Sequence, residues 1–550
     1  MPTRDILHPA DRLVAAMERI YGYRMTTTSG GNLSIREDDG TIWITPARID
    51  KGALRREDIV AIAPDGTVTG RHKPSSEFPF HRQIYAARPE LHGIVHAHPV
   101  ALVAFSICGR VPDTRLFPKS HEICGRVGFA PYALPGSERL GESIAAVFAA
   151  GSDCVLLENH GVVVAAETFE RAFVRFETLE FTAKTLIKAQ AIGGAKVLSD
   201  DRLALARQRL ARPAEWTPGP ATSSERALRR ELCDFIRRGY KQRLLISSQG
   251  TFSARLPDGC FLMTPAGVDR ASLQPEELVF VGPEGIEAGK SASRALPIHA
   301  AIYRAHPSVQ AIAMATPVNS TAFAVSASGL DTRTIPESYI FLRDVATVPF
   351  ETVYGSPEAF AALCRPDFPI SLLEHDGVMV LGTSLLDAFD RLEVLESTAE
   401  AIINSHPLGP VRPMPDAVIE ELIQAFLGGK NSALVQSVGV CLIADRMKSI
   451  DETEASPTKS ILKDLETFRS LLKASVKAYS ARLDTEIATV STRVEALGEA
   501  EKLPAGKLRD LRDMMTLLRH VDIKAEKGRR KDLKKLDSVV GDLSLLVENW

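Results

Sequence analysis

Two stretches of the chain share one pattern of residues, and this repeat decides the fold. The first is LLENHGVVVAAETFERAFVRFETLEFTAKTLIKAQAIGG, residues 156–194, and the second is LLEHDGVMVLGTSLLDAFDRLEVLESTAEAIINSHPLGP, residues 372–410. Self-similarity of this length at a fixed offset of 216 positions indicates a duplicated structural unit. In both stretches two short apolar runs flank a polar turn and precede a long pattern of helical period.

The repeat extends upstream with offsets between 216 and 219. SGGNLSIR from Ser29 matches SQGTFSAR from Ser248, ITPARIDKGAL from Ile44 matches MTPAGVDRASL from Met263, and HRQIYAARPELHGIVHAHPVALVAFS from His81 matches HAAIYRAHPSVQAIAMATPVNSTAFA from His299. We therefore predict two copies of one domain, the first copy at residues 1–210 and the second copy at residues 222–410. The Pro-rich segment 211–224 is predicted to be the linker between them.

Within the first copy, short β-type runs alternate with helical patterns, which is typical of an α/β domain. The predicted strands are residues 41–45, 59–62, 93–96, 155–157 and 162–165, and the predicted helices are residues 11–21, 78–87, 137–149 and 169–191. In the last helix Phe173, Phe176, Leu179 and Thr182/Ala183 recur at helical spacing, which predicts a face buried in the core.

The composition narrows the class of protein. The chain has 66 Lys and Arg residues against 69 Asp and Glu residues, a balance that gives no reason to expect a nucleic-acid partner. No run of about 18 apolar residues and no leader pattern is present, so neither a membrane partner nor secretion is expected. Seven cysteines without a CxxC pair fit a reducing compartment, and a cytoplasmic location is expected.

The last segment, residues 411–550, differs from the copies. It is highly charged, and its leucines recur at helical spacing from Leu462 to Leu472 and from Leu508 to Leu518. Residues 498–506 contain Pro504 between two glycines and are expected to form a turn. We predict a helical hairpin or coiled coil in this segment, without visible chemistry of its own.

The chemistry gathers in the first copy. His96 and His98 lie two residues apart at the end of a predicted strand and so share one face of it. A catalytic zinc site needs three protein ligands and an open position, and His160, in the turn Glu158-Asn159-His160-Gly161, is the third ligand that we predict. We expect Gly161 to let the backbone bend there.

Two polar loops accompany these histidines. The loop from Lys73 to Glu77 leads into a predicted helix, where Ser75 or Ser76 is an N-cap on the simplest interpretation. Glu77 is also a carboxylate suited to take a proton from carbon next to a carbonyl. The loop Ser29-Gly30-Gly31-Asn32-Leu33-Ser34 is either an anion cradle or an ordinary turn before a strand.

Taken together, six motifs of the first copy resemble the class II aldolase/adducin family, in order and in spacing, most closely its L-fuculose-1-phosphate aldolase-like branch. They are Gly31-Asn32-Leu33-Ser34, Thr45-Pro46, Lys73-Pro74-Ser75-Ser76-Glu77, His96-Ala97-His98-Pro99, Ala130-Pro131-Tyr132 and Asn159-His160-Gly161. The resemblance implies a three-layer α/β/α sandwich with a mostly antiparallel central sheet. It also implies a zinc-dependent lyase that cleaves a phosphorylated ketose to dihydroxyacetone phosphate and an aldehyde.

Carried over to this chain, the resemblance implies a set of site residues. The zinc ligands would be His96, His98 and His160, with Glu77 as acid/base and close to the metal; Mn²⁺ and Co²⁺ suit these ligands as well. The implied phosphate-binding residues are Gly31, Asn32, Thr45, Ser75 and Ser76, and Tyr132 matches a tyrosine that reaches a neighbouring subunit's site. Arg48 stands where many relatives have glycine, and we consider phosphate binding, binding of a carboxylate, and mere exposure to solvent as its roles.

The second copy lacks the predicted ligands. His96 becomes Met314, His98 becomes Thr316, His160 becomes Asp376, and Glu77 becomes Ala295, or Arg294 with a one-residue gap. We therefore predict a degenerate second copy that serves as a scaffold.

The resemblance leaves assembly and reaction open to alternatives. Because relatives commonly form C4 tetramers, we predict a homo-oligomer, namely a dimer that builds a pseudo-tetramer of aldolase domains. A site between the copies would face Phe350 in place of Tyr132, unless Tyr354 replaces it. An epimerase, a dehydratase, a decarboxylase and a non-catalytic adducin-like scaffold are the alternatives to the aldolase.

Overall fold

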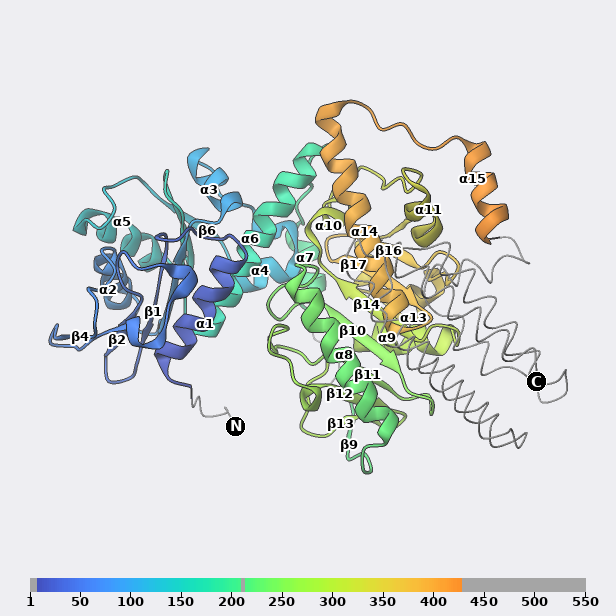
Figure 1. Ribbon diagram of the computed structural model, residues 1–550, viewed down its shortest axis with the longest axis horizontal. Coiled ribbons are helices and arrows are strands. Elements are labelled where there is room, and N and C mark those ends of the chain that lie inside the picture. Colours follow the sequence, from blue (N-terminus) through green and yellow to red (C-terminus); the bar gives the residue numbers. More distant parts are fainter. Residues whose placement is uncertain (1–6, 209–212, 428–550) are drawn as a thin grey trace, which may run out of the picture. The chain divides into compact units, whose positions relative to one another are not determined.

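The computed structural model describes residues 7–208 and 213–427 (Figure 1). Contacts divide the chain into one unit that holds both copies, Met1–Met414, and a second unit that starts at Pro415. In the second unit α15 (Asp416–Leu422) is helical and continues into one π-helical turn, Ile423–Leu427. The helical hairpin predicted for the end of the chain lies outside the described residues.

The first copy is built on one eight-stranded sheet. Its strands are β1 (Asn32–Arg36), β2 (Ile42–Ile44), β3 (Val60–Ile62), β4 (Val68–Thr69), β5 (Gly93–Ala97), β6 (Val127–Ala130), β7 (Cys154–Leu157) and β8 (Val162–Ala166). They lie in the order β4-β3-β2-β1-β5-β8-β7-β6, and only the pair β6–β7 is parallel among them. The mostly antiparallel sheet that the family resemblance implies is thereby confirmed.

Helices cover both faces of this sheet, as Figure 1 shows. On one face α2 (Phe78–Ala87) and α5 (Glu138–Ala149) pack over Ile94, Val155 and Val163. On the other face α1 (Pro9–Gly22), α3 (Val100–Ile107) and α6 (Phe169–Ala191) pack over residues such as Val95 and Val164, which alternate with the first set along the same strands. The remaining helices are α4 (Pro118–Cys124) and α7 (Asp200–Ala206). The first copy is therefore a three-layer α/β/α sandwich.

The predicted elements of the first copy are found within a few residues of their expected bounds. The long helix runs over Phe169–Ala191 as predicted, and Phe173, Phe176 and Leu179 are buried on its core face. Val100–Ile107 was not predicted as a helix, because its run of apolar residues has no helical period.

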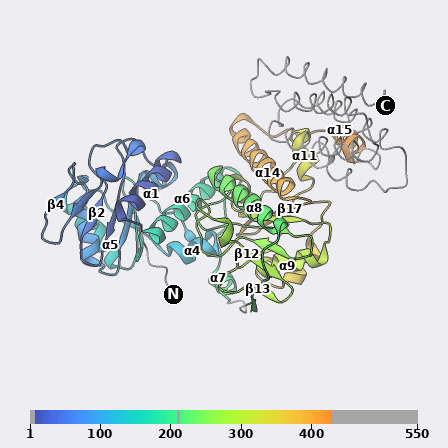
Figure 2. The ribbon, with the colours of Figure 1, turned by 60° about the horizontal axis from the view of Figure 1, so that its bottom comes forward.

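The second copy repeats the same sandwich, seen in Figure 2 with α8 and α14 on one side of the sheet and α9 on the other. Its sheet has the order β15-β16-β17-β14-β10-β11-β12-β13-β9, which is the order of the first sheet with one strand added. The strands are β9 (Glu215–Trp216), β10 (Thr251–Arg255), β11 (Phe261–Met263), β12 (Val279–Gly282), β13 (Gly285–Glu287), β14 (Ala311–Ala315), β15 (Ala346–Val348), β16 (Ile370–Leu373) and β17 (Gly377–Gly382). The helices are α8 (Ser223–Lys241), α9 (Leu296–Ala305), α10 (Val318–Ala324), α11 (Pro336–Leu342), α12 (Phe350–Val353), α13 (Pro357–Leu363) and α14 (Leu385–Ser405).

The added strand corrects the prediction for residues 211–224. Within this segment β9 pairs in parallel with β13, with Ile286 opposite Glu215, and the indole of Trp216 donates a hydrogen bond to the carbonyl of Gly285. Part of the predicted linker is thus an edge strand of the second sheet. A Pro-rich composition indicates an irregular segment, but it does not reveal a pairing partner some 70 residues away.

Candidate metal centre

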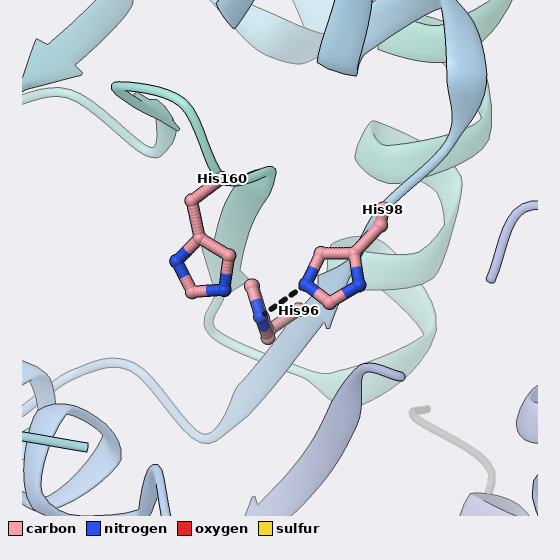
Figure 3. A group of neighbouring side chains, drawn as sticks. All are labelled: His96, His98 and His160. Carbon is pink, nitrogen blue, oxygen red and sulfur yellow. Dashed lines mark hydrogen bonds between the residues drawn. The ribbon is translucent and has the colours of Figure 1, made fainter. Parts of the chain in front are cut away.

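Three histidines converge at the end of strand β5, as Figure 3 shows. His96 is the fourth residue of β5, His98 follows the strand, and His160 lies in the turn between β7 and β8. One ligand atom from each lies within 4.8 Å of the others, and no other such group of three is found in the described part of the chain. The sequence-predicted ligand set is therefore assembled within one copy.

Hydrogen bonds hold His96 and His160 in place. His96 lies opposite Asn32 in the register of β5 with β1, and its Nδ1 donates a hydrogen bond to the carbonyl of Val162, 2.9 Å away. This bond directs the Nε2 lone pair into the cluster, as is usual for a metal ligand. The amide of His160 donates to the hydroxyl of Ser106, at 3.1 Å.

The turn that carries His160 bends in a different way from the expected one. Asn159, not Gly161, adopts the left-handed conformation, with a φ of 54°. Asparagine tolerates this region because its side chain is short and polar. Gly161 instead allows close packing, since a Cβ there would lie 2.6 Å from the carbonyl oxygen of Ala97 and 2.6 Å from the ring of His98.

Glu77 joins the histidines from the start of α2. Its carboxylate lies 3.1 Å from Nε2 of His96 and 3.4 Å from Nε2 of His160. Glu77 occupies the N-cap position of α2, yet its side chain makes no capping bond. The sequence predicted the N-cap at Ser75 or Ser76, but the structure places it at Glu77, one residue after Ser76. The hydroxyl of Ser75 accepts a hydrogen bond from the amide of Glu77.

A chain of buried polar groups holds Glu77 in place. The amide group of Asn32 donates to Glu77 Oε2 at 2.7 Å, and its carbonyl accepts from Nε2 of His81. Nδ1 of His81 in turn accepts from Ser34, which also bonds Tyr85. Burial lowers the pKa of His81 to about 3, so the ring is neutral and its two nitrogens take opposite roles.

The electrostatics of the cluster suit a bound cation. Burial, together with the neighbouring rings, lowers the pKa of His98 to about 3 and that of His160 to about 4, so both are neutral ligands at pH 7. Burial opposes ionisation of Glu77, but His96 and His160 outweigh it and lower the pKa of the carboxyl.

Unpaired acceptor atoms support the same fit. Nε2 of His98 lies 3.2 Å from Nε2 of His96. Glu77 Oε1 is buried and has no hydrogen-bond partner among the described residues. Such crowded acceptors are costly unless a cation lies between them. The three imidazoles and one carboxylate match the ligands of a divalent metal such as zinc.

The residues predicted to bind an anion differ in their burial and in their hydrogen bonds. Gly31 has a φ of 71°, and a Cβ there would lie 2.7 Å from the carbonyl oxygen of His96. Thr45 is fully buried, and its hydroxyl accepts from the amide of Leu33, so it fixes the loop instead of facing a cavity. Ser75 is buried and Ser76 is exposed.

Arg48 and Lys51 follow on the next loop. Arg48 is exposed and holds a φ of 57°, while its counterpart Gly267 has a φ of 72°. Lys51 is buried, donates to the carbonyl of Pro46, and has a pKa lowered to about 8 by burial. Lys51 was not among the predicted site residues, because the spacing between Thr45 and Lys51 does not indicate that Lys51 is buried.

Tyr132 lies apart from the histidines. It follows β6, its side chain is 54% exposed, and its backbone amide donates to Glu158. Its counterpart Phe350 is fully buried.

The second copy holds an ion pair where the first has the three histidines. Met314 takes the register position of His96, opposite Thr251, and Ala295 takes the N-cap position of Glu77. Arg294 lies 3.1 Å from Asp376, and the hydroxyl of Tyr354 donates to Asp376 at 2.6 Å. A guanidinium thus balances the carboxylate in the place where the first copy gathers histidines.

Comparisons with known proteins find similar sequences and structures. The 3-oxo-tetronate 4-phosphate decarboxylase of Pectobacterium atrosepticum is 39% identical over 165 residues, which cover 29% of this chain and 75% of that protein. The L-fuculose phosphate aldolase of Methanococcus vannielii is 29% identical over 170 residues, 30% of this chain and 88% of that protein. Among solved structures, an aldolase II superfamily protein from Pseudomonas syringae is similar with 22% identity and a TM-score of 0.35, over 40% of this chain and 93% of that one.

The family model described as "Class II Aldolase and Adducin N-terminal domain" matches twice, at residues 11–187 and 230–403. These two matches span more than half of the chain and coincide with the two sandwiches. The chain therefore belongs to the class II aldolase and adducin N-terminal domain family.

Proposed function

We propose that the first copy is a zinc-dependent lyase that cleaves a carbon–carbon bond next to the carbonyl of a phosphorylated ketose. The observation that carries the proposal is the convergence of His96, His98 and His160 beside Glu77, whose Oε1 is buried and has no hydrogen-bond partner among the described residues. The first candidate reaction is aldol cleavage of a substrate like L-fuculose 1-phosphate, to dihydroxyacetone phosphate and an aldehyde. Mn²⁺ and Co²⁺ are the alternative metals.

The metal, when bound, would polarise the substrate carbonyl and stabilise the negative charge that bond cleavage leaves behind. The chain's own residues then handle the proton. Glu77 is ionised and aimed into the cluster, and Asn32 fixes its Oε2 while leaving Oε1 free to accept or return a proton at carbon. His81, held neutral, orients Asn32.

The phosphate end of the substrate would lie against the loops beside the cluster. The start of α2 favours negative charge there, as the start of a helix does in general. Ser75, Ser76 and Arg48 add hydroxyl and guanidinium donors. The left-handed backbone of Arg48, where the second copy has glycine, indicates that its side chain is retained at some cost in strain.

Tyr132 is proposed to act at the leaving oxygen of a neighbouring site. Its exposed side chain is free to reach another subunit, and a phenol is a suitable proton donor for an aldehyde oxygen.

Decarboxylation is a second candidate, because the Pectobacterium atrosepticum relative at 39% identity and another from Haemophilus influenzae at 34% are 3-oxo-tetronate 4-phosphate decarboxylases. Both reactions break a bond at the carbon beside the carbonyl and require the same proton return. They differ in the group that leaves, an aldehyde or carbon dioxide. Arg48 suits a substrate that carries a carboxylate as well as a phosphate.

In the experiment, the full-length chain is loaded with zinc and is supplied with each of the two substrate classes. L-Fuculose 1-phosphate and 3-oxo-tetronate 4-phosphate are incubated separately, dihydroxyacetone phosphate is measured by a coupled reductase, and the coproduct is identified by NMR. We expect turnover that is lost in the variant His96→Ala/His98→Ala and retained in His92→Ala, a histidine outside the cluster. Failure of the zinc-loaded chain to turn over either class would refute the lyase.

We also propose a cytoplasmic location and a small-molecule substrate. The six described cysteines are free, which supports a reducing, cytoplasmic setting. None of the described helices is both long and apolar enough to cross a membrane. The proposed partner in catalysis is a small sugar phosphate.

A further inference from the structure

The second copy contains a pocket that is separate from the candidate metal centre. The pocket has a volume of about 590 Å³ and is lined by the first two turns of α8, the 3₁₀ turn Pro275–Glu277, the end of β13 and the segment that follows β9. Figure 1 shows β9 and β13 beside one end of α8. Pockets that hold small organic ligands have volumes of about 300–1,000 Å³, so this pocket is large enough for one.

One arginine holds the frame of the pocket together. Arg229 donates hydrogen bonds to the carboxylates of Glu225 and Glu287, at 2.8 and 3.0 Å. It also donates to the carbonyl oxygens of Pro275 and Leu278, at 3.2 and 2.8 Å. Arg229 therefore joins the helix, the turn and the strand that line the pocket, and its positive charge is balanced within the chain.

Two further arginines line the same pocket without such partners. Arg226 and Arg230 are four residues apart on α8, so they lie on one face of the helix, and both are exposed. Neither guanidinium group forms a hydrogen bond or an ion pair with another described residue. Because a guanidinium group only donates hydrogen bonds and matches the oxygens of a phosphate group in shape and charge, this pair predicts a ligand with a phosphate group.

The first copy lacks this set of charges. At the offset of 219 positions that relates Ser29 to Ser248, the counterparts of Arg226, Arg229 and Arg230 are Leu7, Ala10 and Asp11. In the first copy Asp11 lies 3.2 Å from Arg56, and this ion pair joins the helix directly to the 3₁₀ turn Arg56–Asp58.

The same two positions are changed together in the second copy. The counterparts of Asp11 and Arg56 are Arg230 and Pro275, which cannot form an ion pair and which both line the pocket. The second copy thus has a pocket where the equivalent residues of the first copy join each other.

The walls of the pocket indicate an organic ligand. Pro218, Ala221 and Pro275 supply apolar surface, and Pro218 belongs to the segment after β9, the strand that only the second sheet has. Apolar walls with a few convergent charged groups are typical of sites for organic molecules. Inorganic phosphate alone would leave these walls uncovered.

We propose that this pocket binds a small organic phosphate, with the phosphate group held by Arg226 and Arg230 and the organic part against the apolar walls. Glu276 has an exposed carboxylate at the pocket, which can accept a hydrogen bond from a hydroxyl group of the ligand. The proposal does not depend on the proposed lyase, because no residue of the pocket belongs to the histidine cluster.

The pocket is also distant from the contact between the copies. It lies at the start of α8, whereas Tyr240, near the end of that helix, donates a hydrogen bond to Glu177 of the first copy. A helix of 19 residues is about 28 Å long. Substitutions of Arg226 and Arg230 should therefore leave the fold and the contact between the copies intact.

Isothermal titration calorimetry of the full-length chain with phenyl phosphate, at constant ionic strength, tests the proposal. Inorganic phosphate and phenol are titrated separately, because they are the two parts of this probe. We expect phenyl phosphate to bind more tightly than either part, and to bind at least about tenfold more weakly to Arg226→Ala/Arg230→Ala. A second variant, Arg230→Asp, carries the residue that the first copy has at this position and should weaken binding as well. Arg139→Ala, an exposed arginine near the start of α5, is the matched control and should bind like the unaltered chain.

Each other outcome overturns the proposal. Equal binding by the unaltered chain and both arginine variants would place the phosphate elsewhere, and no binding by the unaltered chain would show that the pocket takes no such ligand. Phenol that binds as tightly as phenyl phosphate would show that the arginines do not select a phosphate group. Inorganic phosphate that binds as tightly would show that the apolar walls take no part. Circular dichroism of each variant verifies its fold, and turnover by the lyase does not enter the test.

Discussion

Replacement of Glu177 tests how the two copies are held together. Glu177 lies in the middle of α6 with no exposed surface, and its carboxylate is the acceptor for Arg243 and Tyr240, both at 2.7 Å, and for the amide and hydroxyl of Ser247. Arg19 approaches it from the first copy at 3.3 Å. In Glu177→Ala these donors lose their common acceptor, and two guanidinium groups lose a buried counter-charge.

The expected cost is large. Removal of one partner from a buried ion pair typically destabilises a protein by about 3–5 kcal/mol, because the remaining charge stays desolvated. Glu170, about two turns earlier on the same helix, offers the control: it pairs with Arg12 at 2.6 Å, but its side chain is 58% exposed. Glu170→Ala should cost about 0–1 kcal/mol.

Urea unfolding, followed by tryptophan fluorescence and circular dichroism, measures both variants. Trp43 in the first copy and Trp216 in the second report on each sandwich. We expect an early transition, or a separation of the two signals, for Glu177→Ala alone. Equal and small effects of Glu177→Ala and Glu170→Ala would refute the assignment of Glu177 as the main link between the copies.

The same carboxylate predicts a pH dependence. Burial alone would raise the pKa of Glu177, but Arg243 and Arg19 outweigh it and hold the pKa below its usual value. A depressed pKa contributes stability above the unfolded value of about 4.3, and this contribution is lost as the pH falls through the folded pKa. The stability difference between the unaltered chain and Glu177→Gln should therefore be full at pH 7 and shrink below about pH 4. A difference that is constant with pH would contradict this origin.

Three further predictions concern the candidate site. Glu77→Gln should keep zinc and lower kcat by about 10²–10⁴-fold, the usual contribution of a general acid or base; a variant as active as the unaltered chain would exclude this role. Gly161→Ala should lower zinc affinity, because the new Cβ would lie 2.6 Å from the carbonyl oxygen of Ala97 and from the ring of His98; equilibrium dialysis with zinc measures it against Gly22→Ala, where no neighbour lies within 4 Å. Arg48→Gly should relieve the left-handed backbone, raise stability by about 1 kcal/mol and raise KM for the phosphorylated substrate; an unchanged KM would place the side chain outside the anion site.

Much of the first copy could be predicted because its local signals agree. Between residues 154 and 191 the apolar runs, the polar turn and the helical period all indicate the observed strand, turn, strand and helix. The meeting of the three histidines could be predicted for a related reason, since His96 and His98 share one strand face and His160 lies in a turn of the neighbouring hairpin.

What could not be predicted depends on contacts between distant parts of the chain. The bond from Asn32 to Glu77 exists because β1 and β5 pair with Asn32 opposite His96, a register that the spacing of the residues does not reveal. Glu177 belongs to a helix predicted to have a buried face, but its partners lie 63–70 residues away in the other copy. The left-handed turn residue was misassigned because glycine is the usual choice, while here Asn159 adopts that conformation and Gly161 provides the close packing.

Bound metal per chain is the most direct test of the account. Elemental mass spectrometry on the purified, zinc-loaded chain should find about one zinc per chain, lost in His96→Ala/His98→Ala. The same pair of positions in the second copy provides the control, and Met314→Ala/Thr316→Ala should keep the full zinc content. A chain that holds no metal after loading, or one that keeps its zinc in the histidine variant, would contradict a metal centre in the first copy.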